Sequence, residues 1–187
     1  RAAWRSCLCS KPCPPPPGMG RSHLLNAIGN HIRFNKPNLR VVRISAEKFL
    51  YDCIESIRRG QMKQFREYYR QITDVLLMDD IHILTRGQSV QEELYHTINA
   101  FTESGRQLVV TSDKLPKETI GMDARVQSRL ESGLIVDIRR ADQETRVAFL
   151  NHKAVAEGFT LPDDVARLVA KNSRSSMGQL NGNFNKL

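Results

Sequence analysis

The order of apolar and polar positions predicts alternating strands and helices, followed by helices alone. Strands are expected at residues 41–44, 75–78, 108–111 and 134–138, and the run at 75–78 is continuously apolar, as in a strand covered on both faces. Helical spacing of apolar residues predicts helices at residues 22–34, 46–59, 62–71, 90–104 and 125–130. Three further helices are expected at residues 143–157, 162–171 and 177–187. The fold class is therefore α/β, a parallel sheet flanked by helices, with a small α-helical lid after it.

The join between the core and the lid is expected near residues 140–143, after the last strand. Asp142 and Thr160 are expected to be the N-caps of the first two lid helices, because their side-chain oxygens can accept hydrogen bonds from the free N–H groups of a first helical turn. The chain is thus divided into an N-terminal segment, residues 1–17, a core, residues 18–140, and a lid, residues 141–187.

The N-terminal segment, residues 1–17, differs from the rest of the chain in composition. Its four consecutive prolines, Pro14 to Pro17, lack backbone donors and can form neither a helix nor a central strand. A glycine loop that opens the first helix needs a buried strand before it, so the sheet is expected to lack its central strand, which a Pro/Cys-rich segment replaces. We expect this segment to be disordered or not native to the fold, as a frame shift would leave it, and the chain to be marginally stable.

Cysteines give no indication of a metal site. Cys7, Cys9 and Cys13 are crowded into the N-terminal segment, and Cys53 lies inside a helical pattern. Zinc sites need two spaced pairs of Cys or His ligands, and no second pair follows these cysteines. Reduced thiols are therefore expected.

Charge indicates a polyanionic partner. The 187 residues carry a formal net charge of +8 and a pI near 9.6, which favours a nucleic acid, a nucleotide or an acidic membrane surface. Apolar runs are only a few residues long, whereas a membrane-spanning helix needs about 20. Residues 1–17 contain no apolar core typical of a signal peptide, so a cytoplasmic location is expected.

A phosphate-binding loop is indicated at the start of the first helix. Gly18, Gly20, Arg21 and Ser22, followed by His23, match the end of the pattern GxxxxGK[ST]. In that pattern backbone N–H groups enclose phosphates and the hydroxyl binds Mg²⁺. Arg21 replaces the usual lysine and a proline takes the place of the first glycine. On the pattern alone, a glycine-rich turn without a ligand fits equally well.

Acidic residues follow two of the expected strands. Asp79 and Asp80 end the apolar run 75–78, as in a Walker B motif, in which the first acid holds Mg²⁺ and the second orients the attacking water. Asp113 follows the strand 108–111, at the edge where parallel sheets bind ligands. Helix-capping acids are the alternative interpretation, but the spacing from the glycine loop favours nucleotide binding.

Two sets of basic residues lie outside these motifs. Arg125 and Arg129 share one helical face and could reach a phosphate held by a neighbouring subunit. Several more cations lie between residues 58 and 70, beside Tyr68 and Tyr69, which could stack on bases. Solvent-exposed helix faces are the alternative interpretation of both sets.

Taken together, the motifs resemble a known family. The segments GMGRSHLLNAIGNHI, SAEKFLYDCIESIR, FREYYRQITDVLLMDDIHIL, QEELYHTINAF, VVTSDKLPKE and RVQSRLESGLIVDI closely resemble the AAA+ domain of the DnaA family of bacterial chromosomal replication initiators, over residues 18–187. The resemblance implies a P-loop AAA+ fold that binds ATP or ADP with Mg²⁺. It assigns Asp79 and Asp80 to Walker B, Asp113 to sensor 1, Arg129 to the arginine finger and Arg125 to an inter-subunit contact.

For nucleic acid, the resemblance implies that residues 46–71 are the initiator-specific insertion, which lines a channel for single-stranded DNA. Ile54 takes the place of an apolar DNA contact, whereas Ser89 replaces the family's partner arginine and Arg86 lies three residues away. The DNA-binding candidates are Ile54, Arg58, Arg59, Lys63, Arg66 and Arg86. The family recognises specific duplex sites through a C-terminal helix-turn-helix domain, and the 187 residues are expected to contain none.

The sequence differs from the family pattern at two positions where the family has a positively charged side chain. Gly178 takes the place of the sensor 2 arginine, and Arg21 replaces the lysine, so at most weak ATP hydrolysis is expected. The expected function is ATP-controlled, head-to-tail oligomerisation on origin DNA, with opening of that DNA. Acidic phospholipid and the replicative helicase are further candidate partners. Two alternatives are a regulator or helicase loader that resembles Hda and acts through protein contacts with ADP, and a scaffold that binds no nucleotide.

Overall fold

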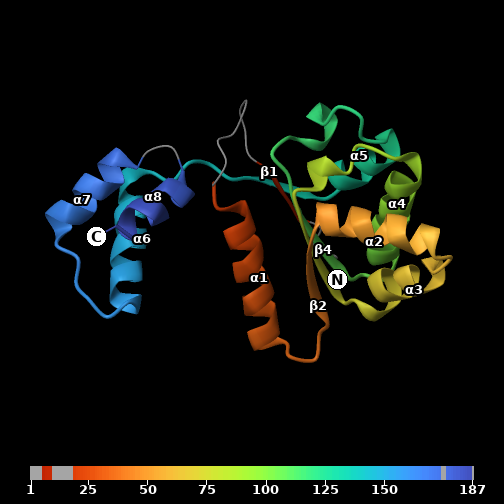
Figure 1. Cartoon of the computed structure of the whole chain (residues 1–187), viewed down its shortest axis with the longest axis horizontal. Coiled ribbons are helices and arrows are strands. Elements are labelled where there is room, and N and C mark those ends of the chain that lie inside the picture. Colours follow the sequence, from red (N-terminus) through yellow and green to blue (C-terminus); the bar gives the residue numbers. More distant parts are fainter. Residues whose placement is uncertain (1–5, 10–18, 174–175, 187) are drawn as a thin grey trace. The chain divides into compact units, whose positions relative to one another are not determined.

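The computed structural model describes residues 6–9, 19–173 and 176–186, the first of these ranges by its backbone alone. The described residues form two compact units (Figure 1). Residues 6–9 and 22–137 make the sheet unit, and residues 19–21, 138–173 and 176–186 make the helical unit.

Among the described residues, the strands are β1 (Ser6–Cys9), β2 (Val41–Ser45), β3 (Val75–Asp79), β4 (Gln107–Thr111) and β5 (Leu134–Asp137). The helices of the sheet unit are α1 (Arg21–Asn35), α2 (Ala46–Arg58), α3 (Met62–Glu67), α4 (Gln88–Glu103) and α5 (Ala124–Glu131), with short helical turns η1 (Tyr68–Ile72), η2 (Ile81–Ile83) and η3 (Pro116–Glu118). The helical unit contains α6 (Gln143–Ala156), α7 (Asp163–Asn172) and α8 (Met177–Phe184). The expected alternation of strands and helices, and the helical tail, are therefore confirmed.

All strand pairs are parallel, in the order β2-β3-β4-β1-β5. This arrangement contradicts the expectation that the sheet lacks its central strand. Within β1, Ser6 pairs with Val109 of β4, and Cys7 pairs with Ile135 of β5. The Cys-rich segment itself thus takes the place of the first strand, because backbone hydrogen bonds to both neighbours fix four residues whose side-chain pattern is too short to indicate a strand. Gly18 and the four prolines lie outside the described residues.

Helices cover both faces of the sheet. Leu76 and Met78 of β3 point into a core that also contains Phe49 of α2 and Leu94 of α4. The intervening Leu77 points to the opposite face, since side chains alternate along a strand. A Cβ atom at Gly29 of α1 would lie only 2.9 Å from Leu77 Cδ1, so a larger residue there would require Leu77 to shift. In the sheet unit, α1 and β2 run in opposite directions (Figure 1).

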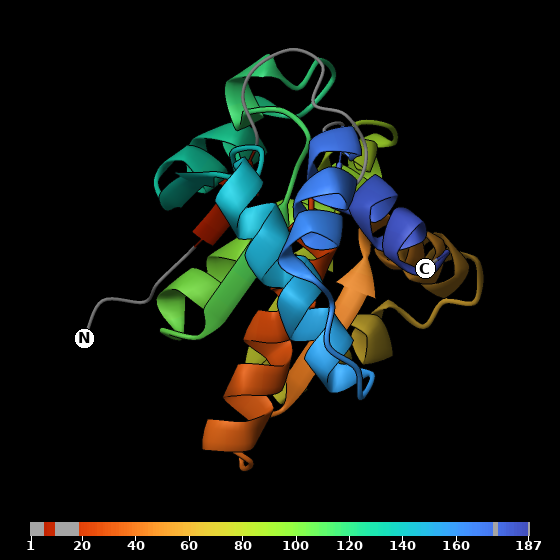
Figure 2. The same ribbon diagram turned by 90° about the vertical axis from the view of Figure 1, so that its left-hand side faces the viewer.

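The helical unit packs α6, α7 and α8 against one another (Figure 2). Their shared core is formed by Leu150, Ala154, Ala166, Ala170, Leu180 and Phe184. Asp142 caps α6 as expected, since its Oδ1 accepts from the Thr145 N–H at 2.7 Å. Thr160 does not cap α7, which begins after Pro162 without a side-chain cap. No helix in the described ranges is both long and apolar enough to span a membrane.

The expected helix at residues 62–71 is two elements. After α3, the π-helical turn η1 widens the backbone and breaks the helical phase. As a result Tyr69 is buried beside Phe49 and Phe65, and its hydroxyl donates to Asp52 Oδ2 at 2.8 Å. The prediction that Tyr69 could stack on exposed bases is therefore wrong, whereas Tyr68 is 46% exposed.

Candidate nucleotide and nucleic-acid sites

The acidic end of β3 is held by a buried threonine of β4. Thr111 Oγ1 donates to Asp79 Oδ1 at 2.5 Å and accepts from the Asp80 N–H at 2.9 Å. Asp80 has the left-handed φ of +58°, which few residues other than glycine adopt. This strained turn directs consecutive carboxylates differently, so Asp79 is buried within the sheet edge and Asp80 is partly exposed.

The second oxygen of Asp79 faces a cation. Arg43 of β2 places Nη2 3.5 Å from Asp79 Oδ2, and the arginine side chain is 42% exposed. The Asp79 carboxylate is therefore fixed by Thr111 on one oxygen, and its other oxygen lies near the positive charge of Arg43. Mg²⁺ keeps most of its waters and needs only one or two protein oxygens, and no cluster of three or more acidic, His or Cys ligands occurs in the part of the chain described. The oxygen donors Asp79 and Ser22 fit Mg²⁺ of this kind.

The start of α1 lies at the same edge of the sheet as Asp79. Because α1 packs on Leu77 through Gly29 and runs against the strand direction, its first turn lies toward the carboxyl ends of the strands. Ser22 and His23 are exposed in this first turn, which contains no acidic residue. Gly20 precedes it with φ of +91°. The free N–H groups of such a turn favour an anion.

Asp113 lies beside a residue that sequence reasoning did not select. Its Oδ1 lies 3.2 Å from Nδ1 of His82, in the turn η2 that follows Asp80. Both atoms are buried and, among the described residues, make no hydrogen bond of good geometry. The contact links the loop after β4 to the loop after β3, the two loops that flank a ligand at this sheet edge.

Arg125 and Arg129 lie at the contact between α4 and α5. Arg125 Nη2 pairs with Asp123 Oδ2 at 2.9 Å, and its guanidinium lies 5.1 Å from the Tyr95 ring centroid. Hydrogen bonds with Asn99 and then Arg129 lower the pKa of Tyr95. Among the described residues, neither arginine forms a hydrogen bond or ion pair with Asp79 or Asp80.

The DNA-binding candidates fall into two groups: five have accessible side chains, and one, Arg66, is bound to a carboxylate of α4. Ile54 is 45% exposed on α2, and Lys63 and Arg86 are also exposed. Arg58 and Arg59 at the end of α2 are exposed but lie 3.7 Å and 2.6 Å from the carboxylate of Glu55. These five side chains remain accessible to a ligand.

Arg66 has a different setting. Its Nη2 donates to Glu93 Oε1 of α4 at 2.5 Å, and Arg70 bonds the other carboxylate oxygen. Burial alone would raise the pKa of Glu93, but the hydrogen bond from Arg66 and the charge of Arg70 hold it below its usual range. Arg66 and Arg70 therefore tie α3 and η1 to α4, a structural role that the spacing of charges along the sequence could not reveal.

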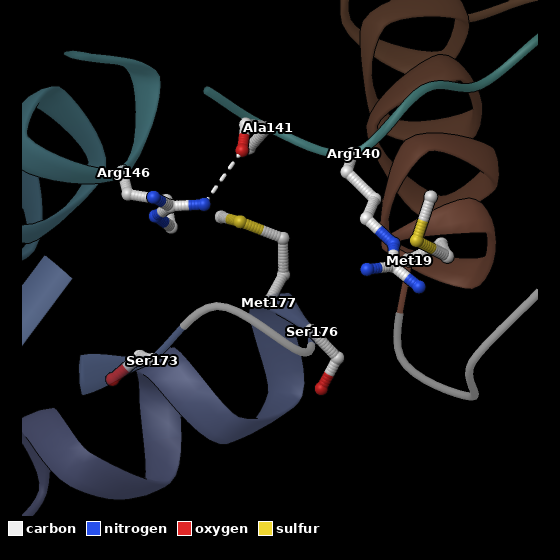
Figure 3. A pocket seen from close by; sticks show the side chains of 7 residues that line it. All are labelled: Met19, Arg140, Ala141, Arg146, Ser173, Ser176 and Met177. Carbon is white, nitrogen blue, oxygen red and sulfur yellow. Dashed lines mark hydrogen bonds between the residues drawn. The ribbon is translucent and has the colours of Figure 1, made fainter. Parts of the chain in front are cut away.

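The helical unit contains a small pocket (Figure 3). Its lining includes Met19, Arg140, Arg146, Ser176 and Met177. Ser176 is the N-cap of α8, whose first turn contains Gly178. Sequence reasoning selected Gly178 here but missed both arginines, because residues far apart in the chain build the pocket.

Comparison with known proteins identifies the family. The model of the Bacterial DnaA ATPase domain matches residues 15–137. The chain belongs to this family. The resemblance seen in the sequence is thereby confirmed.

Relatives extend the similarity. The chromosomal replication initiator protein DnaA of Bdellovibrio bacteriovorus is 46% identical over 172 residues, which is 92% of this chain and 36% of that protein. Domain III of the Thermotoga maritima initiator superposes with a TM-score of 0.87 at 36% identity, covering 95% of this chain and 72% of that one. A DnaA bound to AMPPCP and single-stranded DNA superposes with a TM-score of 0.85 at 26% identity, covering 99% and 55%. The chain spans about a third of the length of the curated initiator that it matches.

Proposed function

We propose that this chain is the ATP-binding AAA+ module of a bacterial replication initiator, acting in the cytoplasm. In the ATP state it would assemble head to tail on single-stranded origin DNA and help to open the duplex. Membership of the DnaA ATPase family and the Walker B acids fixed by Thr111 support the proposal. A related initiator bound to both AMPPCP and single-stranded DNA supports it further.

Each part of the nucleotide site has a distinct task. Backbone N–H groups of Gly18, Gly20 and the first turn of α1, together with Arg21 and His23, would hold the phosphates. Ser22 and Asp79 would hold Mg²⁺, which when bound neutralises phosphate charge. Asp80 would orient a water, but weak hydrolysis at most is expected because Arg21 and Gly178 replace two family cations.

Assembly would use the arginines of α5. Arg129 of one copy would reach the terminal phosphate bound by the next, with Asp113 sensing that phosphate within its own copy. Arg125 would support the contact between copies. The partial exposure of Arg129 is consistent with a role between copies.

Single-stranded DNA would lie along α2, α3 and the turn before α4. Ile54 would contact bases, and Arg58, Arg59, Lys63 and Arg86 would contact phosphates. Residues 46–71 would form the insertion, and residues 141–187 the lid. Acidic phospholipid and the replicative helicase are further proposed partners. The relatives reported above are initiators, which does not favour a regulator that resembles Hda.

Assembly on DNA tests the proposal. The chain is mixed with labelled oligothymidylate and ATP or ADP with Mg²⁺, and complex size is measured by light scattering. We expect complexes of several copies with ATP and only weak binding with ADP. Arg129→Ala should abolish the larger complexes but retain ATP binding. Equal assembly with ATP, ADP and no nucleotide would contradict the proposal.

A further inference from the structure

One face of α4 contacts α5, the helix that contains Arg125 and Arg129. The two helices pack against each other within the sheet unit (Figure 1). Gln91, Tyr95 and Asn99 follow one another at four-residue spacing, which places them on the same side of α4. Gln91 is 8% exposed, and Tyr95 and Asn99 are half-buried. The contact between the two helices therefore includes a row of polar side chains.

Gln91 uses both ends of its side-chain amide at this contact. Its Nε2 donates to the carbonyl oxygens of Gly121 and Thr85, both at 3.0 Å, and its Oε1 accepts from the backbone N–H of Asp123. Asp123 is the N-cap of α5, and Thr85 lies in the loop between η2 and α4. Displacing either segment would leave buried polar groups without partners, which is costly. Gln91 thus fixes the start of α5 relative to the loop that follows η2.

Tyr95 lies one turn further along α4 and contacts both arginines of α5. The Arg125 guanidinium lies 5.1 Å from the Tyr95 ring centroid, within range of a cation–π contact, and Arg125 also pairs with Asp123. Hydrogen bonds with Asn99 and Arg129 lower the pKa of the Tyr95 hydroxyl. One side chain of α4 therefore contacts both guanidinium groups, although Arg125 is exposed and Arg129 is partly exposed.

We propose that Gln91 and Tyr95 are positioning residues for the contact between copies. Gln91 would set the start of α5, and Tyr95 would hold Arg125 and Arg129 in the conformation that a second copy of this chain binds. An arginine loses side-chain freedom on binding, so restraining it beforehand reduces that cost. One hydrogen bond to Tyr95 leaves most of the five donors of Arg129 for a phosphate. The inference rests on the proposed head-to-tail assembly and deepens it.

Assembly of the whole chain on oligothymidylate with ATP and Mg²⁺, measured by light scattering, tests this role. Tyr95→Phe keeps the ring beside Arg125 and removes the hydroxyl that bonds Arg129. The chain concentration needed for assembly should rise about fivefold, because an unrestrained arginine costs more to immobilise, while the ATP affinity measured by calorimetry stays unchanged. Thr102→Val is the control, because it removes a hydroxyl that bonds the Ile98 carbonyl oxygen within the same helix, and it should assemble as the unmodified chain does.

Mixing two variants distinguishes positioning from a general loss of folding. In a head-to-tail pair, one copy provides the arginines and the other provides the nucleotide. Asp79→Ala should lose the nucleotide but keep α5 intact, so it can provide arginines to Tyr95→Phe, whose nucleotide site is intact. Energy transfer between differently labelled chains should therefore show pairs in this mixture as readily as in the unmodified chain. Tyr95→Phe mixed with Arg129→Ala should pair no better than Tyr95→Phe alone.

Gln91→Met has a similar size and removes all three amide hydrogen bonds, so it should give the same pattern, with folding checked by its thermal transition. Normal assembly of Tyr95→Phe, a loss of its ATP affinity, or failure of Asp79→Ala to restore its pairing would each overturn the inference. Those results leave the proposed function standing. An unmodified chain that assembles equally with ATP, ADP and no nucleotide would refute both.

Discussion

The Thr111 hydroxyl bonds both the Asp79 carboxylate and the Asp80 backbone, and the loss of stability on removing it can be predicted in magnitude. Thr111→Val keeps the side-chain shape but removes the donor to Asp79 Oδ1 and the acceptor for the Asp80 N–H. A hydrogen bond to a charged group contributes about 1.5–3 kcal/mol, and an unsatisfied buried N–H costs about 1 kcal/mol more. Since Thr111 is fully buried, we expect the free energy of unfolding to fall by about 3 kcal/mol.

Urea unfolding at neutral pH measures this loss. Thr111→Ser keeps the hydroxyl and loses one methyl group, so its loss should be about 1 kcal/mol. Thr102→Val, whose hydroxyl only bonds the Ile98 carbonyl within α4, is the matched control and should change stability little. If Thr111→Val proves as stable as Thr111→Ser and binds Mg²⁺–ATP equally well, the reasoning about this threonine is wrong.

Three further substitutions test other parts of the structure. Glu93→Gln leaves Arg66 and the mostly buried Arg70 without their carboxylate and should lower the free energy of unfolding by about 3 kcal/mol in urea. Because the folded pKa of Glu93 is lowered, its stabilisation is present above the unfolded pKa of about 4.3, so the difference between the two proteins should shrink as pH falls below 4. Asp80→Gly should raise stability by about 1 kcal/mol, since glycine adopts its positive φ without strain, yet abolish any ATP hydrolysis; an unchanged or lower unfolding midpoint would contradict this. Lys63→Ala should reduce the salt dependence of single-stranded DNA binding, with a change in log–log slope of about 0.7, whereas the lid control Arg167→Ala should leave the slope unchanged.

Sequence patterns were sufficient for most of the fold because buried strands and amphipathic helices each have a distinct period. The helix start at Asp142 also follows local chemistry, since its side chain caps the first turn of α6. Asp79, Asp80 and Asp113 could be selected because parallel strands bring their carboxyl ends to one edge. These features depend on residues near one another in the chain.

The features that were missed depend on residues distant in the chain. Pairing with β4 and β5 places Ser6–Cys9 in the sheet, although its own residues show no strand pattern. Arg66 bonds Glu93, which is 27 residues away in the sequence, and Tyr69 in the π turn η1 is buried whereas Tyr68 is not. The contact between His82 and Asp113 likewise requires two adjacent loops. Charge and periodicity along a sequence do not contain these pairings.

Direct titration of nucleotide tests the central claim, that the start of α1 and Asp79 together hold a nucleoside triphosphate with its metal ion. Calorimetry with ATP should give a saturable heat in the presence of Mg²⁺, reduced without Mg²⁺ and reduced in Asp79→Ala. Absence of heat for both ATP and ADP, in a chain shown to be folded, would contradict the account.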